Sequence, residues 1–144
     1  MTYNIKIATT DDEIKSTFAV MHQLRPHLVD EDYVSLIKRL QTKANYTLVF
    51  LTSSDTPKAA MGFRVSESLV GGQYLYIDDL VTDENARSLG YGKILLDWAT
   101  EYARESGCKE LHLDSGVQRH DAHRFYLRER MDIVFYHFRK KIQA

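Results

Sequence analysis

The sequence predicts a mixed α/β fold, in which a central and mostly antiparallel sheet is flanked by helices. Three consecutive strand patterns between residues 46 and 82 indicate an antiparallel meander. A later strand–helix–strand succession indicates a parallel crossover. The 144 residues are enough for one hydrophobic core, and neither a linker nor an internal repeat interrupts them. We therefore expect a single domain over residues 1–144.

The expected elements follow the order β-α-α-β-β-β-α-β-α-β. Alternating or short apolar runs predict strands at residues 3–8, 46–51, 59–65, 74–82, 111–113 and 133–138. Amphipathic spacing predicts helices at about 11–25, 30–40, 91–106 and 121–130. Side-chain oxygens of residues 9–12 favour the start of the first helix, and Pro26 closes it. Gly107 is expected to cap the third helix.

Charge and cysteine content exclude several functional classes. The net charge is −1, so no global field favours nucleic acid or an anionic membrane. Cys108 is the only cysteine, which rules out an intrachain disulfide and a cysteine-based metal cluster. The first residues lack the apolar stretch of a signal peptide, and no window is apolar enough to span a membrane. We expect a cytoplasmic protein.

A glycine-rich turn between the strand at 74–82 and the following helix is suited to binding a phosphate. It reads Arg-Ser-Leu-Gly-Tyr-Gly-Lys at residues 87–93. Glycines let the backbone turn so that several N–H groups converge on one anion, and a helix N-terminus favours negative charge. The alternative is a plain glycine-containing helix cap. The segment lacks the Gly-Lys-Ser/Thr ending of a P-loop and the first glycine of a dinucleotide fingerprint.

Two motifs resemble those of the GNAT superfamily of N-acetyltransferases. Residues 81–92, Val-Thr-Asp-x-x-x-Arg-x-x-Gly-x-Gly, are similar to its acyl-CoA signature, and residues 122–127, Ala-His-Arg-Phe-Tyr-Leu, to its C-terminal motif. The resemblance implies acetyl-CoA as co-substrate and no metal. It also implies that the backbone of Leu80 and Val81 pairs with pantetheine, beside a bulge near Asp79. The implied pyrophosphate site comprises Arg87, Ser88, Leu89, Gly90, Tyr91, Gly92 and Lys93.

Acetyl transfer to an amine needs a group that accepts the ammonium proton and a group that stabilises the leaving thiolate. By the resemblance, Tyr126 lies near the sulfur and protonates it. Asp78 and Asp79 interrupt an apolar strand, and the corresponding pair in glucosamine-phosphate acetyltransferases supplies the base through water. We favour Asp79, although the sequence leaves Asp78 open. The alternatives are that Tyr126 is a core residue and that the aspartates bind loop amides.

Ser115 follows the strand at 111–113 and is a candidate contact to the cofactor or the acceptor, or an ordinary turn residue. His112, His120 and His123 lie close together in the sequence, but no acidic residue completes a metal-site pattern. In most GNAT proteins a glycine and an aromatic residue end the C-terminal motif. Here Arg130 and Met131 take their place, so this turn is expected to be built differently.

The acceptor is the least determined part of the prediction. Residues 119–129 resemble the same region of bacterial aminoalkylphosphonate N-acetyltransferases, which implies a small primary amine, with an anionic group as one option. Four basic residues are candidates for binding such an anionic group, namely Arg25, His27, Arg64 and Arg119. The alternatives are a protein lysine or N-terminal acetyltransferase and a non-catalytic acyl-CoA-binding regulatory module. A homodimer is also an option.

Overall fold

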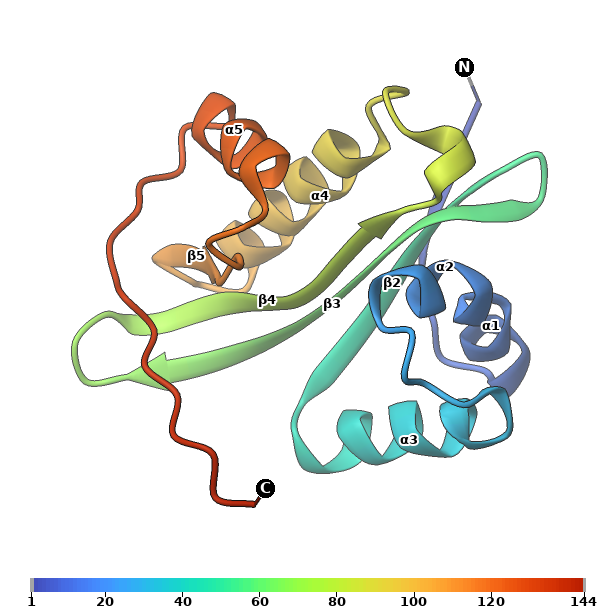
Figure 1. Cartoon of the computed structure of the whole chain (residues 1–144), viewed down its shortest axis with the longest axis horizontal. Helices are drawn as coiled ribbons and strands as arrows, with labels where there is room; N and C mark the ends of the chain where they lie inside the picture. The colour runs from blue at the N-terminus through green and yellow to red at the C-terminus, as the bar shows by residue number, and fades with distance from the viewer. Residues whose placement is uncertain (1, 144) are drawn as a thin grey trace. The chain divides into compact units, whose positions relative to one another are not determined.

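The computed structural model describes residues 2–143, which form two compact units. The first unit extends to Leu113 and contains the sheet, and the second begins at Asp114. Each unit is described by itself below (Figure 1). The expectation of one continuous domain therefore stays a prediction.

The first unit contains a sheet whose five strands, among residues 2–143, lie in the order β1-β2-β3-β4-β5. The strands are β1 (Asn4–Ile7), β2 (Tyr46–Ser53), β3 (Thr56–Ser68), β4 (Gly72–Thr82) and β5 (Glu110–Leu113). The first four pair antiparallel with their neighbours, whereas β5 runs parallel to β4. The predicted fold class, a mixed and mostly antiparallel sheet flanked by helices, is confirmed.

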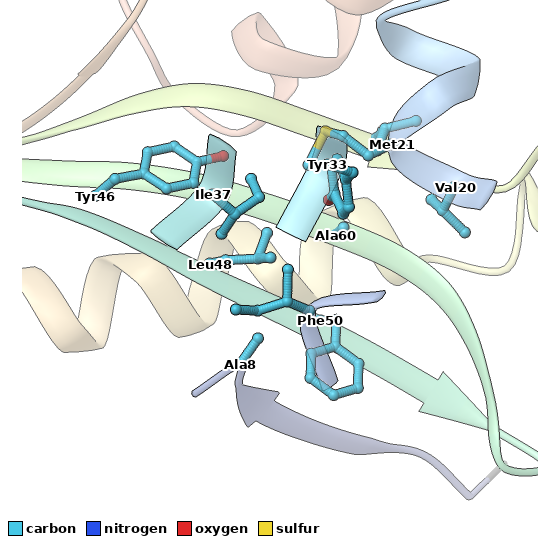
Figure 2. Packing of buried hydrophobic residues seen from close by; sticks show 11 residues of the cluster. Ala8, Val20, Met21, Tyr33, Ile37, Tyr46, Leu48, Phe50 and Ala60 are labelled. Carbon is cyan, nitrogen blue, oxygen red and sulfur yellow. The ribbon is translucent and has the colours of Figure 1, made fainter. Parts of the chain in front are cut away.

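Helices cover both faces of this sheet (Figure 1). They are α1 (Asp11–Ser16), α2 (Phe18–Leu24), α3 (Asp30–Lys43) and α4 (Tyr91–Glu105). Leu48 and Phe50 of β2 pack with the buried side of α1–α3, as Figure 2 shows. Phe63 of β3 packs instead on Trp98 and Tyr102 of α4, with ring centroids 6.1 and 5.0 Å away. The alternation of side chains along each strand thus builds a core on either side.

The first predicted helix is in fact two helices, because Thr17 breaks it. The Thr17 amide donates to the Ile14 carbonyl three residues earlier. The Thr17 side chain is fully buried and shares a 2.7 Å hydrogen bond with the hydroxyl of Tyr33. At the start of α1, Thr10 and Glu13 form the expected type of cap. Bonds from the Thr9 and Thr10 amides lower the pKa of Glu13 to about 2.

Both α4 and the second unit's helix, α5 (His120–Arg128), end in the same left-handed turn. Gly107 has φ +79° after α4, as predicted for a capping glycine. Arg130 has φ +67° after α5. There the Met131 amide donates to the Tyr126 carbonyl and the Arg130 amide to the Leu127 carbonyl, the pattern of a glycine cap. The expectation of a differently built turn is therefore wrong, because arginine adopts the conformation that glycine would favour.

The predicted last strand is also wrong, because the structure forms no strand at residues 133–138. Branched and aromatic side chains favour a strand, but a strand exists only where its backbone joins a ladder. The large apolar side chains of this segment are instead 62 to 93% exposed. Sequence composition could not reveal that the ladder is missing.

Candidate active site

The centre of β4 contains a β-bulge at Asp78. In the ladder with β3, Asp79 pairs with Gly62, and the next pair joins Ile77 to Phe63. Asp78 is therefore the extra residue of β4 and has no register partner on β3. An extra residue bends the strand and increases its local twist. A bulge is thus found directly beside Asp79, where the resemblance to the GNAT superfamily implied one.

Beyond the bulge, β4 has a sheet partner on one side only. Its pairs with β5 extend from Tyr74 to Ile77, whereas its pairs with β3 continue to Thr82. Leu80 and Val81 lie in the stretch that β5 leaves uncovered. An edge of this kind can accept an extended chain as an added strand.

The glycine-rich turn connects this open stretch to α4. A short 3₁₀ helix, η1 (Glu84–Ala86), comes first, and the exposed residues 87–90 follow. Ser88 and Gly90 both have positive φ, +71° and +84°. Gly90 is the N-cap of α4, and a Cβ atom placed on it would meet nothing within 4 Å. The turn therefore presents backbone next to open space at a helix N-terminus, as an anion site requires.

Gln23 of α2 forms two hydrogen bonds with the start of this turn. Its side-chain amide donates to Asp83 Oδ1 at 3.0 Å, and its carbonyl oxygen accepts from the Glu84 amide at 2.9 Å. The Asp83 amide in turn donates to the Lys58 carbonyl at 2.8 Å. The sequence analysis did not identify Gln23, because nothing local connects residues 60 positions apart.

Both aspartates of β4 form ion pairs with arginine. Arg64 donates from Nε and Nη2 to the two carboxylate oxygens of Asp78, at 2.7 and 2.9 Å. Arg25, at the end of α2, donates from Nε to Asp79 Oδ1 at 2.9 Å and from Nη2 to the Asp78 carbonyl at 3.0 Å. The side chains of Asp78 and Asp79 remain 28 and 17% exposed. Arg25 and Arg64, two of the candidates for binding an anionic acceptor, thus already form ion pairs with carboxylates of the chain itself.

Tyr46 completes the surroundings of Asp79. Its hydroxyl donates to Asp79 Oδ2 at 2.8 Å. Asp79 is therefore bonded on one oxygen by a guanidinium and on the other by a phenol. Sequence analysis predicted Tyr46 only as the start of a strand. Its contact crosses from β2 over β3 to β4 and has no signature in the sequence.

The remaining candidate residues belong to the second unit. Burial raises the pKa of Tyr126, and Arg119 lowers it by a smaller amount. The Ser115 hydroxyl oxygen is buried and has no hydrogen-bond partner among residues 2–143. His123 Nε2 lies 2.7 Å from the Gly116 carbonyl oxygen. Within the same described range, no three His, Cys, Asp or Glu side chains converge as metal ligands would.

Cys108, in the first unit, shows no sign of a nucleophile. Burial raises the pKa of its thiol, which disfavours the reactive thiolate.

A strand that is open on one side, beside a turn that offers backbone amides at a helix N-terminus, is the arrangement expected in a protein that binds an extended, phosphate-bearing ligand. The comparison with known families gives the specific result. The model of the Acetyltransferase (GNAT) family matches residues 10–131. The chain therefore belongs to the GNAT acetyltransferase family and is an N-acetyltransferase. Enzymes of this family use acetyl-CoA as co-substrate.

Individual relatives agree with this assignment. The chain is 37% identical to the uncharacterized N-acetyltransferase YhdJ of Bacillus subtilis, over 96% of this chain and 99% of that protein. It is 39% identical to the aminoalkylphosphonate N-acetyltransferase of Salmonella typhimurium, over 46% of this chain and 43% of that protein. A solved structure described as a transcriptional regulator from Bacillus halodurans shares the fold, with a TM-score of 0.83 at 23% identity, covering 98% of this chain and 100% of the other.

Among residues 2–143, none of the helices combines the length and the apolar character needed to cross a membrane.

Proposed function

We propose that the protein transfers the acetyl group of acetyl-CoA directly to the primary amine of a small molecule, within a ternary complex. The observation that carries this proposal is the open stretch of β4 next to the left-handed Gly90 turn. One accepts an extended amide-bearing arm, and the other accepts a phosphate. Pantetheine and pyrophosphate are those two parts of coenzyme A.

The residues that would bind acetyl-CoA follow from these two parts of the ligand. Backbone groups of Leu80 and Val81 would pair with the pantetheine arm, because β5 does not cover them. Amides of the turn and the first residues of α4 would bind the pyrophosphate, with Arg87 and Lys93 adding positive charge. These amides belong to Ser88, Leu89, Gly90, Tyr91, Gly92 and Lys93. Ser115 has a buried hydroxyl oxygen with no hydrogen-bond partner among the described residues, which suits a contact to the same ligand.

Proton transfers accompany each bond change in the reaction. The acceptor ammonium must lose one proton before its nitrogen attacks the thioester carbonyl carbon. The C–S bond then breaks to release a thiolate, which takes up a proton, and the new amide nitrogen loses its second proton to solvent, from which the donor to the thiolate is restored. We assign the first step to Asp79, through water, with Asp78 as the alternative. We assign protonation of the thiolate to Tyr126, whose raised pKa keeps its hydroxyl protonated at neutral pH.

A small acceptor is favoured over a protein acceptor by one comparison. The Salmonella relative is named for an aminoalkylphosphonate, which is a small amine that carries an anion. We extend this substrate class to the present chain as part of the proposal. We also propose that both units form one catalytic domain, since the family model spans them, and that the enzyme works in the cytoplasm, as a monomer or a homodimer.

Binding of acetyl-CoA, measured by calorimetry, tests the donor half of the proposal. We expect heat of binding and a higher melting temperature. A protein that shows neither at saturating ligand would contradict the donor site. Release of CoA thiol, measured over a panel of small amines and lysine peptides, tests the acceptor. Turnover with peptides alone would replace the small-molecule proposal, and binding without any turnover would indicate a regulatory module.

The role of Tyr126 has its own test. We expect Tyr126→Phe to lower kcat by about 100-fold, because the thiolate loses its proton donor while the ring is retained. The affinity for acetyl-CoA, measured by calorimetry, should stay within about twofold. Unchanged turnover with an identified acceptor would refute the assignment.

A further inference from the structure

Tyr46 occupies an unusual place for a tyrosine in the core of the first unit. It begins β2, is 6% exposed, and belongs to the cluster between the sheet and α1–α3 (Figure 2). Most side chains of that cluster are apolar, yet the Tyr46 hydroxyl donates to Asp79 Oδ2 at 2.8 Å. A buried hydroxyl of this kind is costly without its partner. The contact therefore fixes the phenol and the carboxylate together.

Gly62 of β3 makes this contact sterically possible. A Cβ atom on Gly62 would lie 1.6 Å from the Tyr46 hydroxyl oxygen and 2.1 Å from Cζ. Such distances are far below van der Waals contact, so any side chain here would displace the phenol. Gly62 is also the register partner of Asp79. The glycine therefore opens the path along which Tyr46 crosses β3 to reach β4.

Tyr46 can act on Asp79 in one way only. Burial, followed by the nearby charge of Asp79, raises the pKa of Tyr46 well above its usual value. The phenol therefore stays protonated and always donates. A phenol that always donates keeps the accepting carboxylate oxygen in one place. Removing this donor would leave Asp79 Oδ2 without that contact.

We propose that Tyr46 is a positioning residue for acetyl transfer, whose hydroxyl holds Asp79 in the orientation that accepts the proton of the acceptor ammonium. Gly62 provides the space that this contact needs. The proposal rests on the assignment of Asp79 as the base in the proposed function. It assigns a catalytic consequence to a side chain that lies inside the core.

Other charged and titratable groups also face Asp79. They are Arg25 at the end of α2, Tyr33 on α3, Asp78 in the bulge, and Arg64 on β3, which acts through Asp78. Arg25 occupies Oδ1, so it would preserve an ion pair when Tyr46 is changed. The Tyr33 hydroxyl shares its 2.7 Å hydrogen bond with Thr17 instead. Tyr33 therefore offers a matched control, a second buried phenol in the same cluster.

The test compares Tyr46→Phe with Tyr33→Phe. The kcat and the KM of each variant are measured with the acceptor identified by the amine panel. We expect Tyr46→Phe to lower kcat by about tenfold, because a base that is no longer held in place accepts the proton less well. The KM for the acceptor should stay within about twofold, because Tyr46 does not contact the acceptor in this proposal. Tyr33→Phe should leave kcat within about twofold, because its hydroxyl bonds to Thr17.

A second variant and a double variant separate positioning from a general loss of structure. Gly62→Ala displaces the phenol without removing it, so it should lower kcat in the same way as Tyr46→Phe. In the Asp79→Asn background, Tyr46→Phe should cause no further loss of kcat, because the base that it positions is already absent. Circular dichroism checks that each variant is folded. If folded Tyr46→Phe keeps full kcat, or if it lowers kcat equally in the Asp79→Asn background, the proposal is overturned. If Asp79→Asn retains full turnover, the base assignment of the proposed function is wrong instead.

Discussion

The two halves of β4 differ in a way that separates the structural role of the strand from its functional one. From Tyr74 to Ile77 the strand is paired on both sides, with β3 and with β5. From Asp79 to Thr82 it is paired with β3 alone. The first half contributes the fully buried Leu75, whereas the second half contributes two aspartates and an open edge. One continuous strand thus stabilises the sheet and offers a ligand-binding edge.

The change occurs at the bulge. In a regular strand, Asp78 and Asp79 would point to opposite faces. Here Asp78 is bonded by Arg64 and Asp79 by Arg25 and Tyr46. Irregular backbone beside an ionised pair is typical of functional sites rather than of sheet interiors. Substitutions in the two halves of β4 and in the turn that follows test this difference. We expect their effects on stability, turnover and binding to decrease in that order.

The largest expected effect is on stability, in the doubly paired half. We expect Leu75→Ala to lower the free energy of unfolding by about 3 kcal/mol, because a fully buried side chain leaves a cavity. Leu80→Ala, in the open half, should cost about 1 kcal/mol, because Leu80 is only partly buried. Urea denaturation of the free protein measures both. Equal losses would show that the two halves do not differ in this way.

The next effect is on turnover, in the open half. We expect Asp79→Asn to lower kcat by about 100-fold, since the amide cannot accept the ammonium proton. Asp78→Asn should lower kcat by less than about tenfold, because the bidentate pair with Arg64 indicates a structural role. Both variants keep the size of the side chain. A larger loss for Asp78→Asn than for Asp79→Asn would transfer the base to Asp78.

The smallest effect is on binding of acetyl-CoA, at the turn that follows the open half. We expect Gly90→Ala to weaken this binding about fivefold, because φ +84° strains an alanine by about 1 kcal/mol and displaces the turn amides. The matched control is Gly107→Ala, at the other end of α4 with φ +79°. It carries a similar strain, and it should lower stability without changing affinity for acetyl-CoA. Calorimetry distinguishes the two, and equal affinities would argue against a role for the Gly90 turn.

Local signals in the sequence were enough to predict the parts of the site that are built from neighbouring residues. The glycines at 90 and 92 predicted a tight turn into α4, and the resemblance to the GNAT superfamily implied the bulge near Asp79. The contacts of those aspartates could not be predicted. Arg25 and Tyr46 lie 54 and 33 positions from Asp79, so only the packing of α2 and β2 against the sheet brings them together.

The sequence by itself determined the mixed sheet and the family, because periodicity, turn residues and short motifs are local properties. The tertiary structure decided what happens at long range. One predicted helix is divided at Thr17, where the buried threonine hydroxyl shares a hydrogen bond with Tyr33 on another helix. The tertiary structure left residues 133–138 without the strand that their composition favours, because a ladder depends on a neighbouring backbone. It also placed a buried phenol on Asp79, through the space left by a glycine on the strand between them.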